Sequence, residues 1–413
     1  MGLSEASLGR LYFMEANSME DLREDLFEQI KISAKCVVED VCKIRPDERV
    51  LIITNRVVER PSICWKNQEI SFEVAQAEFI SQALYDACEA VGAKVSMATQ
   101  PTKSSMDAAD ESVIAALKTE PDVCFSISHN KLGKDVAAIS NPYKDEAGNS
   151  FDHIFDYLLY GKKTMRSAWT PGITLDMFGR TVGIDYQQLQ QRCKTLCDLY
   201  QNVATVEIKA PAGTDLVIPV DGRKPFSDDG DFSRPGSGGN VPAGEVFISP
   251  VVGDGKESGC RGRIAFDGSM SVNVGCVAIK TPIVVDVAGG FISNISGGDE
   301  AQKLLDTITQ AEEEALAMGK DGRLSTEDAQ LYCRNARNIG ELGIGLNPTA
   351  TITGNMLEDE KAFRTCHIAI GENYDNDAHA LIHLDGVIRN PTIDFVYTDG
   401  SRRRILEDGV LTF

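Results

Sequence analysis

The sequence lacks the features that mark membrane, exported or nucleic-acid-binding proteins. No apolar run approaches the roughly 18–20 residues that a transmembrane helix needs, and acidic residues interrupt the N-terminal segment, unlike a signal peptide. Basic residues are the minority, because 41 Lys and Arg oppose 62 Asp and Glu and give a formal charge of −21. Since this charge repels a phosphate backbone, we expect neither nucleic acid nor a membrane as a partner.

The 11 cysteines contain no CxxC pair, and their number is odd. Because a chain of this size can stabilise itself by burial, we interpret them as reduced thiols of a cytoplasmic protein. Cys193 and Cys197 are one helical turn apart and could contribute to a zinc site. No Cys or His neighbour completes four ligands, so a buried helix face is the preferred interpretation.

Common phosphate-binding and serine-hydrolase motifs are also missing. Neither GxGxxG, GxxxxGK[ST] nor GxSxG occurs. The Gly-rich segment at residues 234–240 is not followed by a helix that would aim backbone N–H groups at a phosphate. We therefore expect a flexible loop there, within an antiparallel region, and find no support for a serine hydrolase of the GxSxG class.

Length and local patterns predict two domains. At 413 residues the chain exceeds the usual size of one domain. Apolar residues recur at helical spacing over residues 29–42, and the apolar run at residues 50–54 is typical of a buried strand. This alternation of helices and strands continues and predicts an α/β N-terminal domain with a mostly parallel sheet, residues 1–203.

The second half has a different pattern. Asp-Gly, the strongest short hairpin signal, does not occur in residues 1–220 and occurs eight times afterwards. We therefore expect a β-rich α+β domain with antiparallel strands over residues 204–413. A helical insertion around residues 303–335 interrupts this domain.

Histidines are few and clustered. Three of the five, His367, His379 and His383, fall within seventeen residues. His383 and Asp385 are two apart in a strand-like run, so both face the same side and could share a metal ion. Alone, each would be an ordinary residue at a sheet edge. Together they favour a site for zinc, manganese, cobalt or iron in the second domain.

Two glutamates extend the candidate set. Glu245 and Glu341 each lie between turn residues and an apolar, β-rich run, where a buried carboxylate needs a positive neighbour such as a metal ion. Outside this set, His129 follows a strand of the first domain and either contacts substrate or lies at the surface. His379 is either a partner of the ligands or exposed.

Four segments resemble the signature of a family of thermophilic metallo-aminopeptidases, which comprises aminopeptidase T, aminopeptidase S and PepS. The segments are GGNVPAGEVF, IGELGIGLNP, LEDEKAFRTCHIAIGENY and IHLDGV. The resemblance covers the second half well and the first half only in general. In that family, two glutamates, two histidines, a tyrosine and an aspartate hold two metal ions, and the matching positions here are Glu245, Glu341, His367, Tyr374, His383 and Asp385.

The resemblance implies a metal-dependent aminopeptidase that hydrolyses the N-terminal residue from peptides. Two divalent ions, whether zinc, cobalt, manganese or magnesium, would polarise the scissile carbonyl and acidify a bridging water, which attacks as hydroxide. Glu341 would bridge the ions, and Tyr374 would ligate one of them or stabilise the oxyanion. The family also implies a homodimer.

A second family is similar over the same segments. The iron-dependent 2,5-dihydroxypyridine ring-opening dioxygenases share an HLD segment equivalent to residues 383–385. In their pattern a histidine stands at the position of Glu341 and completes a two-His, one-carboxylate triad for iron(II), while the positions of Glu245 and His367 are apolar. This chain has Glu, Glu and His at these places, which favours the dinuclear peptidases. A metal-binding module without catalysis is a third hypothesis.

Overall fold

The computed structural model describes residues 16–55, 64–65, 68–69, 72–103, 107–127 and 132–413. Contacts divide the chain into two compact units, Met1–Asp185 with Gly230–Pro242 and Tyr186–Asp229 with Ala243–Phe413. Among the described helices, none combines the length and apolar character that a bilayer span requires.

The division differs from the expected boundary at residue 203 in two places. Helix α8 (Tyr186–Leu199) packs on β11 (Phe226–Asp228) and β13 (Glu245–Ile248) and therefore belongs with the second unit. Residues 230–242 return to the first unit, because β12 (Gly238–Asn240) joins its sheet. The sequence shows where the local pattern changes, whereas long-range contacts define the units.

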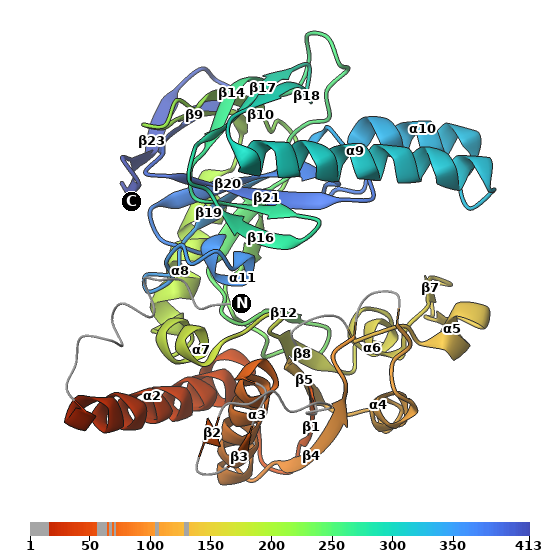
Figure 1. Ribbon diagram of the computed structural model, residues 1–413, viewed down its shortest axis with the longest axis vertical. Coiled ribbons are helices and arrows are strands. Elements are labelled where there is room, and N and C mark those ends of the chain that lie inside the picture. Colours follow the sequence, from red (N-terminus) through yellow and green to blue (C-terminus); the bar gives the residue numbers. More distant parts are fainter. Residues whose placement is uncertain (1–15, 56–63, 66–67, 70–71, 104–106, 128–131) are drawn as a thin grey trace. The chain divides into compact units, whose positions relative to one another are not determined.

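The first unit contains a parallel sheet with the strand order β12-β8-β5-β1-β4, which confirms the expected α/β class of this region. Strand β1 (Arg49–Asn55) is buried from its second residue onward, as a strand covered on both faces requires. Its Leu51 and Ile53 pack in one core with residues of α4. Helix α3 covers the other face (Figure 1).

The other elements of the first unit have the following bounds. The strands are β4 (Lys94–Gln100), β5 (Val123–Ile127), β8 (Arg166–Trp169) and the pairs β2 (Cys64–Trp65) with β3 (Gln68–Glu69) and β6 (Tyr143–Lys144) with β7 (Ser150–Phe151). The helices are α2 (Ala16–Cys36), α3 (Phe72–Ala90), α4 (Glu111–Leu117), α5 (Val136–Ser140), α6 (Ile154–Asp156) and α7 (Leu175–Thr181), with π-helical turns at Val37–Val41 and Tyr157–Gly161.

The Gly-rich segment is not the loop that we expected, so that prediction is wrong. Its Gly238–Asn240 part is strand β12, which pairs in parallel with β8. A Cβ atom on Gly238 would lie 2.7 Å from the carbonyl oxygen of Ser167, so only glycine allows this edge strand to approach its neighbour. The glycines serve close backbone packing here rather than flexibility.

The second unit consists mainly of two antiparallel sheets, as the β-rich pattern predicted. Their strand orders are β18-β17-β14-β10-β9-β22-β23-β24 and β11-β13-β19-β20-β21-β15-β16. The bounds not given above are β9 (Val203–Lys209), β10 (Asp215–Pro219), β14 (Arg261–Phe266), β15 (Ser269–Val272), β16 (Gly275–Ala278), β17 (Ile283–Ala288), β18 (Phe291–Ser296), β19 (Ile339–Gly345), β20 (Thr365–Gly371), β21 (His383–Arg389), β22 (Thr392–Tyr397), β23 (Arg402–Glu407) and β24 (Val410–Leu411).

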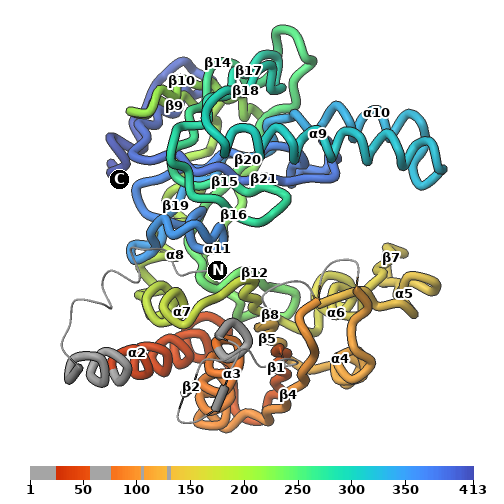
Figure 2. Tube along the Cα trace, viewed as in Figure 1, coloured from red at the N-terminus to blue at the C-terminus, as the bar shows by residue number. Residues whose placement is uncertain are grey.

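The helical insertion is a hairpin of two helices. Helices α9 (Asp299–Lys320) and α10 (Thr326–Asn335) pack side by side along their length (Figure 2). Ser325 caps α10 by accepting a hydrogen bond from the backbone N–H of Asp328. The unit also contains, besides α8, the short helix α11 (Met356–Asp359), which precedes β20.

Seven of the eight Asp-Gly pairs lie between strands or helices, and one does not. Asp399-Gly400 joins β22 to β23, as a hairpin signal predicts. Asp385-Gly386 instead lies inside β21. A Cβ atom on Gly386 would come within 2.5 Å of the Met270 side chain, so this glycine is explained by packing and leaves Asp385 free to serve another purpose.

Candidate metal centre

Four neighbouring strands of the second sheet carry the predicted ligands. Glu245 begins β13, Glu341 lies on β19, His367 on β20, and His383 and Asp385 on β21. These strands are adjacent in the order β13-β19-β20-β21. Alternate residues of a strand share a face, and neighbouring strands lie close together. Five side chains from these four strands can therefore meet on one side of the sheet.

The strand register explains how the ligands meet. Ala369 of β20 pairs with Glu341 on one side and with Asp385 on the other. His367, two residues before Ala369, pairs with Gly343. All of these residues therefore lie on one face, in two neighbouring cross-strand rows.

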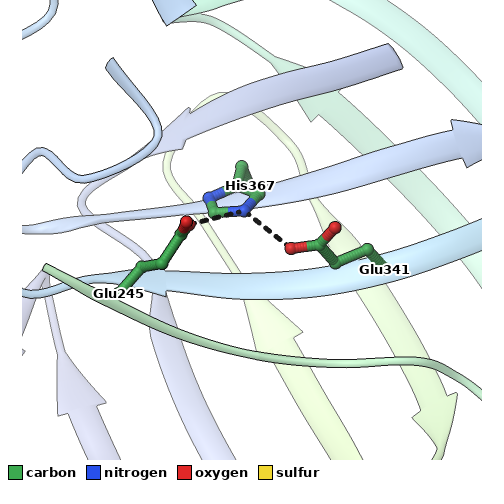
Figure 3. Close-up of side chains that lie close together, drawn as sticks. All are labelled: Glu245, Glu341 and His367. Carbon is green, nitrogen blue, oxygen red and sulfur yellow. Dashed lines mark hydrogen bonds and ion pairs between the residues drawn. The ribbon is translucent and has the colours of Figure 1, made fainter. Parts of the chain in front are cut away.

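Glu341 lies between the two histidines. Its Oε1 is 3.1 Å from His367 Nε2, and its Oε2 is 3.1 Å from His383 Nε2. Glu245 Oε2 lies 3.4 Å from the same nitrogen of His367, so both glutamates point to that imidazole (Figure 3). Asp385 Oδ1 lies 3.4 Å from His383 Nε2. Two three-residue groups thus share Glu341.

These groups have the chemistry and burial of a divalent metal site. One consists of Glu245, Glu341 and His367 and the other of Glu341, His383 and Asp385, each with its ligand atoms within 4.8 Å of one another. Glu245 is 6% exposed, Glu341 3% and His367 1%. Oε2 of Glu245 makes no hydrogen bond to any described residue. Buried carboxylates in this arrangement need cations, and nitrogen and oxygen donors suit divalent metals.

Gly343 makes room for one of the ligands. A Cβ atom at this position would lie 2.0 Å from Nε2 of His367, closer than any side chain can tolerate. The absence of a side chain therefore allows the imidazole to lie over β19 and reach both glutamates. Gly343 belongs to the segment IGELGIGLNP, which resembles the aminopeptidases. Nothing in the sequence, however, indicates that this glycine makes room for His367.

The carboxylates change the protonation of the histidines. Burial opposes the charged imidazole of His367, but its contact with Glu341 and the charge of Glu245 outweigh burial and raise its pKa to about 9. Burial acts the same way on His383, where Asp385 and Glu341 raise the pKa well above its usual value. In turn, His383 overcomes the effect of burial and lowers the pKa of Asp385 to about 2.

Metal binding is therefore expected to release protons. At pH 7 both imidazoles of the metal-free protein are protonated, whereas a ligating imidazole must be neutral. Affinity should consequently rise with pH as both imidazoles lose their protons, which for His367 occurs at about pH 9. Zinc titrations by calorimetry at pH 7, in two buffers of different ionisation enthalpy, measure the release. Identical heats in the two buffers would mean that the imidazoles were already neutral.

Lys361 is a buried cation beside the candidate ligands, and sequence analysis gave it no role. The side chain is fully buried. Its Nζ lies 3.1 Å from Glu245 Oε1 and 3.7 Å from Asp228 Oδ2, and it also contacts Glu360. Burial opposes its charge, but Glu245 and Glu360 raise the pKa of Lys361 well above its usual value. The lysine thus fixes one oxygen of Glu245 and leaves the other facing His367.

The acids around Lys361 are difficult to ionise. Burial raises the pKa of Asp228 to about 7 and that of Glu360 to about 8, despite the attraction of the lysine. Glu360 and Lys361 belong to the segment LEDEKAFRT that resembles the aminopeptidases. The resemblance of this segment was the only sign in the sequence that Lys361 belongs to the site. Because lysine is rarely buried, the residue type by itself indicates a position at the surface.

Tyr374 lies beside the two groups. Its ring centroid is 5.2 Å from that of His383, and its backbone N–H donates to Ser249 Oγ over 3.2 Å. Burial and the negative charges of Glu341 and Asp385 raise the pKa of its hydroxyl. The hydroxyl therefore remains protonated, while its role as a ligand stays a prediction.

The other singled-out residues have different surroundings. His379 is exposed and lies 3.2 Å from Glu372, outside both groups. His129 lies outside the described residues. Cys193 is buried in α8, Cys197 is partly buried, and both are free thiols that belong to neither of these groups.

Comparisons with known proteins give two kinds of relative. The profile of a family described as 2,5-dihydroxypyridine 5,6-dioxygenase matches residues 182–394. Among solved structures, the 2,5-dihydroxypyridine dioxygenase of Pseudomonas putida KT2440 is 15% identical, with a TM-score of 0.62, over 94% of this chain and 97% of that one. Wild-type AmpT from Thermus thermophilus is 14% identical, with a TM-score of 0.57, over 94% and 99%. No curated protein sequence matches the chain. At these identities the structures show a shared fold.

Proposed function

The chain belongs to the 2,5-dihydroxypyridine 5,6-dioxygenase family, but on the basis of its candidate metal ligands we propose that it is a metal-dependent aminopeptidase that removes the N-terminal residue of peptides. One observation carries the proposal. Glu341 presents one oxygen to His367 and the other to His383, so that two ligand groups share a single carboxylate. A carboxylate shared between two groups suits a dinuclear hydrolytic centre, in which two ions lie close together.

The balance of charge supports two ions rather than one. Glu245, Glu341 and Asp385 bring three carboxylates to the site, and Lys361, the buried cation that contacts Glu245, is shared with Asp228 and Glu360. A single iron held by two histidines and one carboxylate would leave buried negative charge uncompensated. Two divalent cations offset it. The ligand set therefore favours hydrolysis over oxygen chemistry.

The residues of the site can then be given roles. When bound, two metal ions would polarise the scissile carbonyl and make a water nucleophilic at neutral pH. Glu245, Glu341 and His367 would hold one ion, and Glu341, His383 and Asp385 the other. A metal ion held there could also bind the free α-amine of a peptide, which would explain selection of the N-terminal residue. Tyr374 keeps its proton and can donate a hydrogen bond to the developing oxyanion.

The second candidate function is iron(II)-dependent opening of a dihydroxypyridine ring. The family profile favours it, because the description of that family names this reaction. The solved dioxygenase also shares the fold over nearly the whole chain. A substrate for either reaction is a peptide or another small molecule. The homodimer and the cytoplasmic location expected from the sequence stay predictions.

Metal content and oxygen dependence distinguish the two reactions. We expect protein purified without added metal to bind two divalent ions per chain and to hydrolyse aminoacyl-nitroanilides in the absence of oxygen. Elemental analysis and an anaerobic hydrolysis assay measure this. One iron per chain, with consumption of oxygen and 2,5-dihydroxypyridine and no hydrolysis, would establish the second function instead.

A further inference from the structure

Three aromatic side chains lie next to the candidate metal centre. The rings of Phe226 and Phe247 stack with centroids 5.3 Å apart, and the ring of Tyr374 lies 4.8 Å from that of Phe247. Phe226 is 40% exposed and Tyr374 49%, although the neighbouring glutamates are buried. The Tyr374 ring meets His383 edge-on. The aromatic surface is therefore continuous with the ligands.

The sheet places these rings on the face that carries the ligands. Phe247 and Glu245 are alternate residues of β13 and point to the same side. Phe247 pairs with Gly343, which in turn pairs with His367. A residue without a side chain thus separates the phenyl ring from the imidazole. The neighbouring strand β11 adds Phe226 directly opposite Phe247.

The segment that carries the third ring is held by a network of polar contacts. Tyr374 lies in the segment between β20 and β21, where Arg223 Nη2 donates to Asp377 Oδ2 over 2.7 Å and to the carbonyl oxygen of Pro250 over 3.2 Å. Ser249 accepts the backbone N–H of Tyr374. These contacts fix the backbone that carries the ring before any ligand binds, which reduces the entropy lost on binding.

We propose that Phe226, Phe247 and Tyr374 form a subsite for a large aromatic or apolar side chain on the N-terminal residue of a peptide. This inference rests on the proposed aminopeptidase function. The ligand groups would fix the α-amine and the scissile carbonyl, and the side chain of the same residue then extends onto the adjacent rings. Aromatic contacts favour Phe, Tyr, Leu and Met, whereas nearby carboxylates disfavour Asp and Glu.

Binding of amino acid hydroxamates tests the subsite without requiring turnover. L-phenylalanine hydroxamate and L-alanine hydroxamate share the groups that bind metal and differ only in the side chain. In calorimetric titrations of the full-length, zinc-loaded protein, we expect the phenylalanine compound to bind about tenfold more tightly. Phe226→Ala should reduce this preference about fivefold and leave binding of alanine hydroxamate within about twofold.

A matched control separates the subsite from a general loss of apolar surface. Leu316 is exposed to the same extent as Phe226 and lies on α9, which carries none of the candidate ligands, so Leu316→Ala should keep the full preference. Equal affinity of the two hydroxamates for the wild-type protein overturns the proposal. So does a Phe226→Ala variant that weakens binding of 2,5-dihydroxypyridine and leaves the hydroxamate preference unchanged.

The outcomes for the subsite and for the reaction are distinguishable. Preference for phenylalanine hydroxamate that depends on Phe226, in a protein that hydrolyses no peptide, supports the subsite and contradicts the reaction. Peptide hydrolysis with equal kcat/KM for N-terminal Phe and Ala supports the reaction and contradicts the subsite. The two peptides used in this kinetic comparison differ only in their first residue.

Discussion

Glu341→Gln is expected to lower peptide hydrolysis by about 10²–10³-fold or more, the loss typical of removing an electrostatic stabiliser from a catalytic centre. The substitution keeps the size of the side chain but removes the charge that lies between His367 and His383. Both ligand groups contain Glu341, so both should lose metal affinity. The ratio kcat/KM at saturating metal, together with metal content, measures the effect.

Glu372→Gln is the matched control for this experiment. Glu372 also lies near a histidine, His379, but this pair is exposed and outside the ligand groups. Its replacement should change kcat/KM by less than about twofold, because exposed ion pairs contribute little. Circular dichroism verifies that both variants are folded. Near-normal hydrolysis by Glu341→Gln would show that Glu341 is not a ligand and that the dinuclear assignment fails.

Lys361→Met should destabilise the protein by about 3–5 kcal/mol, the usual cost of leaving buried charges without their partner. The methionine fills similar space, but Glu245, Glu360 and Asp228 lose the cation that they surround. Denaturant titration of the metal-free protein measures the loss. Burial already raises the pKa of Asp228 to about 7 and of Glu360 to about 8, so these carboxyls become neutral as the pH falls. The deficit of the variant should therefore be smaller at low pH and larger at high pH.

Lys194→Met provides the comparison for a lysine at the surface. Lys194 lies 2.6 Å from Asp198 on helix α8, with both side chains about two-thirds exposed. An exposed pair of this kind contributes at most about 0.5 kcal/mol. Equal stability of the Lys361 and Lys194 variants would mean that the carboxylates around Lys361 are already neutral and need no cation.

Local patterns were sufficient for the class of each unit but not for its boundaries. Strand β1 could be predicted because a continuous apolar run is typical of a parallel strand that is covered on both faces, and β1 is buried in this way. Strand β12 could not, since three residues of a Gly-rich segment reach a distant sheet edge through backbone contacts alone. Helix α8 was recognised as a helix, but its assignment to a unit depends on which strands it packs against.

The candidate site shows the same limit. The period of two along β21 was enough to place His383 and Asp385 together. The meeting of Glu341 with His367 required the pairing of β19 with β20, which a single sequence does not contain. The family resemblance supplied the set of ligands but not this pairing. Lys361 escaped notice because burial of a lysine is the exception, and its compensation comes from acids distant in the sequence, such as Asp228.

Gly343 has a consequence for how such a site can evolve. While residue 367 is a histidine whose imidazole lies over β19, any side chain at position 343 would collide with it. Substitution of this glycine is therefore excluded. In relatives whose residue 367 is small and apolar, that steric restriction disappears and position 343 can acquire a side chain. Substitutions at the two positions should therefore be correlated across relatives, and gain of the histidine should follow, not precede, the presence of the glycine.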